Sequence, residues 1–396
     1  MRPLLPFLLS LALVHAEEPL PYRTDADGPV VKKVLREGKP LPWFQLVEGQ
    51  FPPEGSAHRI SGELIRVDHL ERTFHLRVDR NDSQDRGVWD IPLPAAMLPY
   101  GAIWYRGAPA ALEDIPLHTH LHGLFYEQRP GDKPPELGTA FGRKSPEGTF
   151  GRCLQLEDDF SARSRMQQLW TIQRVDWAAM KLTASLPSAP PQTFDLLTST
   201  QVFEGRSFAE LKAIQPGMQV LLNLTWATLY GPGRITEVWL DQTARSLATA
   251  QQLEKHRIHT RERGLPGWVT AVDDEQEWVT VHLFGNVDPA LLEEIQLAPL
   301  PAQPPKEGSP PPPEAQGRLA VARESLMTYD PVNDSKTARL LDLTKTPAPP
   351  GSSGVQIRVK VGMMLEGYRP RRIVRFFPPS WPVRALPQEE QFFGRE

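Results

Sequence analysis

The chain has 396 residues, of which 40% are hydrophobic and 23% charged, and its formal net charge is −4. This length predicts several domains. The small negative net charge gives no overall electrostatic attraction to nucleic acid. There are 42 prolines, about twice the average frequency. Because proline is excluded from helix interiors and central strands, we expect many short strands joined by extended loops.

Residues 1–16 have the pattern of a cleaved signal peptide. Arg2 precedes an apolar stretch from Leu4 to Val14, and Val14 and Ala16 are the small residues that a peptidase accepts before the cut. The stretch is shorter than the roughly 20 residues that span a bilayer. We therefore predict export to the periplasm or the cell exterior, no membrane span, and an extended segment at 17–57.

Residues 58–150 are expected to form a first β unit. The pattern G-x-[LV]-x-x-V-D at 62–68 is followed by alternating apolar residues at Phe74, Leu76 and Val78. Such alternation is typical of a β-hairpin with one buried face. An L-x-x-I turn at 112–115 then leads into another strand. The unit is thus predicted as a hairpin, an insertion, a turn and a returning strand.

Parts of this unit recur along the chain. G-x-[LV]-x-x-V-D returns at 267–273, a weaker copy lies at 172–176, and a second L-x-x-I turn occupies 211–214. Recurring units predict a mainly β protein with tandem small antiparallel barrels of the OB or SH3-like type, since closed barrels bury short amphipathic strands and remove their edges. The second unit is expected at 151–242, and a helix with a third hairpin at 243–298.

The best helix pattern covers 243–263 and stops at Gly264. We expect His256 and His259 on a solvated basic face of this helix. Its predicted buried side carries four apolar residues, Leu247, Ala250, Leu253 and Ile258.

Two proline-rich stretches divide the rest of the chain. The segment 299–317 predicts an extended linker. Residues 318–396 are expected to contain a separate closing strand pair, 355–361 with 371–377, and a tail.

The densest group of metal-ligand side chains is His118, His120 and His122. Alternate residues of a strand lie about 6.6 Å apart on one face, so two neighbouring imidazoles can converge on a metal about 2.0–2.1 Å from each nitrogen. A third histidine needs a bulge, and Glu127 is a candidate further ligand. The sequence thus offers a site for Zn²⁺, Cu²⁺ or Ni²⁺, with solvated strand residues as the alternative.

The corresponding segment of the second unit indicates on which face of the strand these histidines lie. Residues 217–221 carry Gly, Gln and Leu where the histidines stand, so the fold itself does not require them. Thr119 and Leu121 correspond to the apolar face of that segment. We therefore expect the histidines on the accessible face of the strand.

A basic and aromatic segment near the end of the chain is a second candidate site. Basic residues interleaved with aromatic ones can grip a polyanion or stack on sugars, whereas an ordinary amphipathic strand shows the same alternation. The candidate ligand-binding residues are Arg369, Arg371, Arg372, Arg375 and Trp381.

Two further features are candidates for chemical sites. Glu157, Asp158 and Asp159 offer paired carboxylates for acid–base chemistry, but adjacent acidic residues are more typical of a solvated turn. Cys153 is the only cysteine, so an intramolecular disulfide is excluded and a buried thiol is expected. The sequence contains no G-x-S-x-G, H-E-x-x-H or P-loop motif, and it predicts no catalytic residue and no organic cofactor.

Four features carry a resemblance to known proteins: the recurring hairpin pattern, the L-x-x-I-x-x-G strand entry, and the segments 264–268 and 367–372. Together they resemble uncharacterised exported bacterial proteins with tandem small barrels of unknown function. The resemblance implies this architecture and an exported location. We therefore expect a non-enzymatic binding or scaffold protein of the cell envelope, whose partner is an envelope protein or polymer. Metal binding and polyanion or glycan binding are the alternatives.

Overall fold

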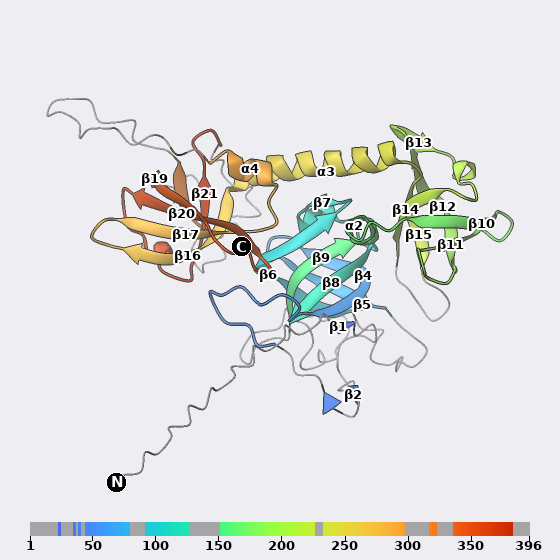
Figure 1. The fold of residues 1–396 in the computed structure, drawn as a ribbon, viewed down its shortest axis with the longest axis horizontal. Coiled ribbons are helices and arrows are strands. Elements are labelled where there is room, and N and C mark those ends of the chain that lie inside the picture. Colours follow the sequence, from blue (N-terminus) through green and yellow to red (C-terminus); the bar gives the residue numbers. More distant parts are fainter. Residues whose placement is uncertain are drawn as a thin grey trace, which may run out of the picture.

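The computed structural model describes residues 44–79, 92–126, 151–225, 233–295, 297, 317–322 and 336–382. It also describes short strands before residue 44, namely β1 (Arg23–Thr24) and the pair β2 (Leu35–Arg36) and β3 (Lys39–Pro40). The chain is mainly β, with three small closed barrels (Figure 1). The expected fold class is confirmed. The predicted signal segment 1–16, Glu127 and the linker 299–316 lie outside the described residues.

The first barrel runs in the order β4-β5-β6-β9-β8 and closes where β8 pairs with β4. Its elements are β4 (His58–Asp68), β5 (Thr73–Val78), β6 (Leu93–Tyr105), β7 (Ala108–Pro109), the 3-10 helix η1 (Leu112–Asp114), β8 (His120–Tyr126) and β9 (Arg152–Asp158). β9 runs parallel to β6, so the barrel is not purely antiparallel. Cys153 and Leu156 of β9 pack into the first core, and this strand therefore lies in the first barrel rather than in the unit expected from residue 151.

The second barrel has the same order, β10-β11-β12-β15-β14, with β15 parallel to β12. The short helix α2 (Asp159–Arg165) joins the first barrel to the second. The elements of the second barrel are β10 (Trp170–Asp176), β11 (Lys181–Ser185), β12 (Gln192–Glu204), β13 (Ser207–Ala209), the 3-10 helix η3 (Leu211–Ala213), β14 (Gln219–Leu224) and β15 (Arg234–Trp239).

The third barrel has six strands in the order β16-β17-β20-β19-β18-β21. Its elements are β16 (Leu265–Asp273), β17 (Trp278–Phe284), α4 (Pro289–Glu293), β18 (Arg318–Val321), β19 (Lys336–Lys345), β20 (Ser352–Val361), the 3-10 helix η5 (Glu366–Tyr368) and β21 (Ile373–Phe377). The prediction of a separate closing strand pair is wrong. β20 pairs with β17 and β19, and β21 with β16 and β18, because the β16–β17 hairpin needs further strands to close its core.

The three barrels begin with the same backbone arrangement. In each one the first strand has a bulge, and the residue before the bulge exchanges two hydrogen bonds with the turn that enters a returning strand. The accepting carbonyls belong to Leu64, Ile172 and Val269, and the donating N–H groups, at 2.7–2.8 Å, to His118, Gly217 and Arg371. These donors have φ values of 71°, 89° and 69°. This left-handed conformation takes His118 out of the regular strand.

The glycine of the recurring hairpin pattern has a steric cause. A Cβ atom at Gly62 would lie 2.2 Å from the carbonyl oxygen of Arg77, and one at Gly267 would lie 2.6 Å from that of His282. Since any side chain would force the paired strands apart, both hairpins need glycine at this position.

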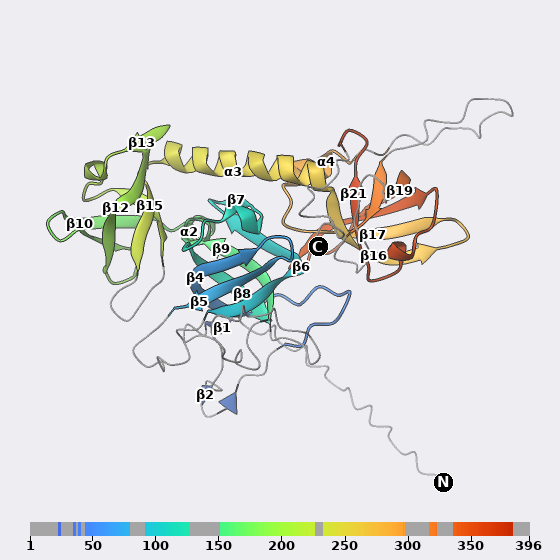
Figure 2. The same cartoon turned by 180° about the vertical axis from the view of Figure 1, so that it is seen from behind.

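The long helix α3 (Gln242–Arg263) passes from the second barrel over the first to the third (Figures 1 and 2). Asp241 caps its start, and its location agrees with the prediction. The expected buried face is wrong. Ile258 is 51% exposed, and the stripe that packs inward is Ala244, Ala248, Gln252, His256 and Thr260.

The inward stripe of α3 is polar because it meets backbone and polar groups of the first barrel. Gln252 of this stripe donates to Asp114 at 3.0 Å, and Thr249 beside the stripe donates to the carbonyl of Arg106 at 2.8 Å. A hydropathy pattern cannot identify such a face, since it depends on partners far away in sequence. Within the described part of the chain, no helix combines the length and apolarity that a bilayer span requires.

Candidate metal centre

His120 and His122 lie on the outer face of β8. Leu121 between them is fully buried in the first core, so strand alternation places both imidazoles on the opposite side. Their ring centroids are 4.9 Å apart. His120 is nevertheless only 5% exposed, because α2 packs on β8. The expectation of accessible histidines is therefore wrong for His120, whereas His122 is half-buried.

Asp159 completes a group of three ligand side chains. Its Oδ1 lies 2.9 Å from Nδ1 of His120 and 3.0 Å from Nε2 of His122. One ligand atom from each of the three residues lies within 4.8 Å of the others. Ligand atoms around a four-coordinate Zn²⁺ are about 3.3 Å apart when the metal–ligand bonds have their usual length. A small outward movement of these side chains would therefore accommodate such an ion.

The end of β9 explains how Asp159 reaches the histidines. Asp158 pairs with Leu121 in the strand register, and its side chain accepts the backbone N–H of Ser161 at 2.9 Å as the N-cap of α2. The cap turns the chain into the helix directly after the strand. Asp159, the first helical residue, then lies over the outer face of β8.

Each of the three side chains is held by a further partner. Nε2 of His120 lies 2.8 Å from Oδ2 of Asp79, and Nδ1 of His122 lies 2.8 Å from Oγ of Ser61. Oδ2 of Asp159 accepts the backbone N–H of Leu224 at 3.1 Å. Metal-bound histidines usually donate their second ring N–H to a carboxylate or another oxygen, which fixes tautomer and orientation. Both histidines have such a partner.

Neighbouring opposite charges determine the direction in which the pKa values of His120 and Asp159 are shifted. Burial alone would lower the pKa of His120, but the carboxylates of Asp159 and Asp79 outweigh burial and raise that pKa well above its usual value. Burial would raise the pKa of Asp159, but the two imidazoles outweigh it and lower that pKa. Without a metal, His120 is thus an imidazolium between two carboxylates.

The structure separates His118 from the other two histidines. Its imidazole is 64% exposed, and its Nδ1 contacts Oε1 of Glu63 at 2.7 Å instead. Of the predicted ligand set, His120 and His122 come together, His118 does not, and Glu127 lies outside the described residues. Sequence analysis missed Asp159 as a partner, although the run of acids at the end of a strand was a usable signal.

The three acids 157–159 do not form the solvated turn that we expected. Glu157, Asp158 and Asp159 are all buried, at 3%, 0% and 4% exposure. Glu157 pairs with Arg165 at 3.0 Å, and burial raises the pKa of Asp158 to about 6. Cys153 is buried, as expected, and burial raises its pKa.

Asn223 connects the metal centre region to the second barrel. It is buried in β14, its Oδ1 accepts the N–H of Phe160 at 2.9 Å, and its amide donates to Asp158 and to Glu237, both at 2.9 Å. Glu237 in turn pairs with Arg106 of the first barrel. A continuous polar network therefore joins the two barrels beside Asp159.

The C-terminal candidate residues do not share a binding surface. Arg369 pairs with Asp274 at 2.8 Å, and Trp381 is buried and donates to Glu294 at 2.6 Å. Arg371 is exposed, whereas Arg372 and Arg375 are half-buried. The aromatic residues of this segment, Tyr368, Phe376 and Phe377, are buried in or beside the third core. The rings are thus buried in the protein, whereas the arginines lie at its surface or are half-buried.

Comparisons with known protein families, with curated proteins and with solved structures found no match for this chain.

Proposed function

We propose that this chain is an exported, non-enzymatic binding or scaffold protein of the cell envelope that holds a divalent metal ion between its first two barrels. The observation that carries the metal site is the convergence of His120, His122 and Asp159. Export rests on the signal pattern of residues 1–16. The metal would be bound by Nδ1 of His120, Nε2 of His122 and a carboxylate oxygen of Asp159.

The donor set favours a late transition metal. Two imidazole nitrogens and one carboxylate oxygen suit Zn²⁺, and Cu²⁺, Ni²⁺ and Fe²⁺ also bind imidazole. Ca²⁺ and Mg²⁺ prefer sets made of oxygen alone. Zn²⁺ is the ion that we propose.

The role proposed for the metal is to stabilise the contact between β8 and α2, the helix that connects the first two barrels. Asp159 begins the helix that connects the two barrels, and its second carboxylate oxygen accepts the N–H of Leu224 in the second barrel. His120 and His122 belong to the first barrel. A metal bound by all three residues would tie the connecting helix to β8, because it adds bonds that the unfolded chain lacks.

Elemental analysis tests this proposal directly. The full chain is dialysed against Zn²⁺ and then against metal-free buffer, and zinc is counted per chain for the unaltered protein, His122→Ala and His118→Ala. We expect one zinc in the unaltered protein and in His118→Ala, and none in His122→Ala. His118 is the matched control, since it lies two residues before His120 but contacts Glu63. Absence of zinc from the unaltered protein, or equal zinc in both variants, would overturn the proposal.

A further inference from the structure

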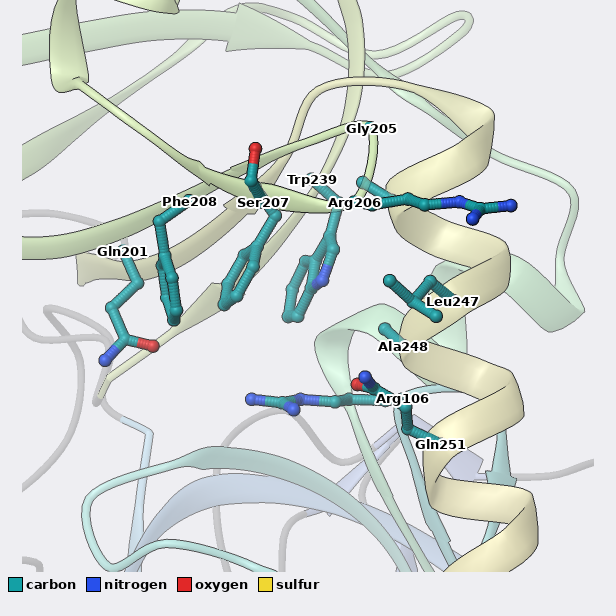
Figure 3. Close-up of a pocket in the computed structure, with 12 residues that line it drawn as sticks. Arg106, Gln201, Gly205, Arg206, Ser207, Phe208, Trp239, Leu247, Ala248 and Gln251 are labelled. Atoms are coloured by element: carbon teal, nitrogen blue, oxygen red, sulfur yellow. The ribbon is translucent and has the colours of Figure 1, made fainter.

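A cavity of about 250 Å³ lies where the second barrel, α3 and the first barrel meet (Figure 3). The turn after β6 supplies Arg106, the β12–β13 hairpin supplies Phe203 and Phe208, and Trp239 lies at the end of β15. The first half of α3 forms the opposite wall with Leu247, Ala248 and Gln251 (Figure 3). Its residues are distinct from those of the metal centre.

Three aromatic rings form one wall of the cavity. Phe203 and Trp239 are stacked, with centroids 5.4 Å apart and planes at 9°. Phe208 also packs on Phe203, with centroids 4.9 Å apart. Figure 3 shows Phe208 and Trp239 on the same side of the cavity, opposite Leu247 and Ala248 of α3. Phe208 is 71% exposed, so its ring is accessible to a further planar group.

The charged side chains that line the cavity are both cationic, Arg106 and Arg206. The Arg106 guanidinium carbon lies 5.9 Å from the centroid of Phe203 and 5.6 Å from that of Trp239. Its Nη2 pairs with Glu237. Its Nε is one of the buried side-chain nitrogens in the described part of the chain without a hydrogen-bond partner. A ligand cannot reach this buried nitrogen directly, but the Arg106 side chain is 26% exposed, so an acceptor oxygen of a ligand can contact the guanidinium through its exposed atoms.

We infer that this cavity binds a small planar aromatic carboxylate. Aromatic walls select a flat ring, which gains stacking energy that a puckered ring lacks. Arginine recognises a carboxylate through charge-assisted hydrogen bonds. The volume suits a compound of one or two rings, since pockets for drug-sized ligands measure about 300–1,000 Å³. This inference stands independently of the metal centre.

Calorimetric titration of the full chain with three matched probes tests the inference. 2-Naphthoate carries both features, 2-naphthamide lacks the charge, and cyclohexanecarboxylate lacks the planar ring. We expect 2-naphthoate to bind with a Kd in the micromolar range, and the other two at least tenfold more weakly. Failure of 2-naphthoate to bind, or equal binding of the amide, would overturn the inference.

Four variants, two in the cavity and two controls outside it, locate the binding. Phe208→Ala removes an exposed ring and is expected to weaken 2-naphthoate binding at least tenfold, whereas Met363→Ala, which removes an exposed side chain of the third barrel, is expected to leave it unchanged. Arg106→Lys keeps the charge but removes the planar guanidinium, which can bind a carboxylate through two parallel hydrogen bonds, and at least a tenfold loss is expected. The His122→Ala variant should bind 2-naphthoate as the unaltered protein does. Unchanged binding in Phe208→Ala would exclude this cavity as the site.

Discussion

Asp159 Oδ2 accepts a hydrogen bond of 3.1 Å from the backbone N–H of Leu224, although 65 residues separate the two. The other oxygen of the same carboxylate contacts the imidazoles of His120 and His122. One buried side chain therefore links a strand of the first barrel to a strand of the second. A substitution of this carboxylate should therefore weaken both metal binding and the contact between the two barrels.

The variant Asp159→Asn should lose both properties. The amide cannot balance the imidazolium of His120 and is a poor metal ligand, so we expect at least a hundredfold loss of zinc affinity. Breaking a buried ion pair typically costs about 3–5 kcal/mol, and we expect the free energy of unfolding of the metal-free chain to fall by a similar amount. Denaturant titration with and without zinc measures both effects. Retention of zinc affinity in this variant would contradict the ligand role.

The partners of the two histidines should tune affinity without changing stoichiometry. In Asp79→Asn and Ser61→Ala the ligand atoms remain, but Nε2 of His120 loses its charged partner in the first variant, and Nδ1 of His122 loses its hydrogen-bond partner in the second. Such outer contacts typically contribute about 10–100-fold in metal affinity. Competition with a fluorescent chelator should show this loss with one zinc still bound per chain. A complete loss of zinc would indicate that Asp79 or Ser61 is itself a ligand.

Replacing Asn223 should weaken the junction without touching the metal ligands. Asn223→Ala leaves Asp158 and Glu237 short of one hydrogen bond each, and the N–H of Phe160 without its acceptor. Buried polar groups left unpaired cost about 1–3 kcal/mol each, and we expect a loss of at least about 3 kcal/mol by denaturant unfolding. Gln173→Ala, which removes an exposed hydrogen bond, is the control and should change stability little.

The stability of the contact between α3 and the start of α4 should depend on pH through His256. Burial lowers the pKa of His256 to about 4, and its Nε2 accepts the N–H of Asp288 at 3.3 Å. The folded chain keeps this imidazole neutral, while the unfolded chain takes up a proton below its usual pKa of 6.5. His256 therefore costs no stability above pH 6.5, and the cost grows as the pH falls towards 4, up to about 3 kcal/mol.

The variant His256→Gln isolates this contribution. Glutamine can accept the same N–H but does not titrate. As the pH falls from 7 to 4.5, we expect the free energy of unfolding of His256→Gln to increase relative to that of the unaltered protein. A difference that is independent of pH would contradict a neutral, buried imidazole.

Local patterns in the sequence predicted the elements of the fold better than their partners. The alternation at Phe74, Leu76 and Val78 and the stop of α3 at Gly264 act over a few residues, and both are seen in the structure. The parallel pairing of β9 with β6 and the closure of the third barrel by β18 to β21 depend on contacts across long insertions. No short pattern encodes such contacts.

The same distinction applies to the site. His120 and His122 were predicted as neighbours because strand alternation places them on one face. Asp159 joins them only because β9 pairs beside β8 and an N-cap turns the chain. His118 leaves the group because its backbone adopts the left-handed turn that Gly217 and Arg371 adopt in the other barrels.

X-ray absorption of the zinc-loaded full chain tests the central claim most directly. We expect a first shell of nitrogen and oxygen atoms at about 2.0–2.1 Å, with the outer scattering of two imidazole rings. His122→Ala, which should lose its zinc on dialysis, should not give this spectrum, and His118→Ala should match the unaltered protein. A shell without imidazole scattering, or one unchanged by His122→Ala, would contradict the site formed by His120, His122 and Asp159.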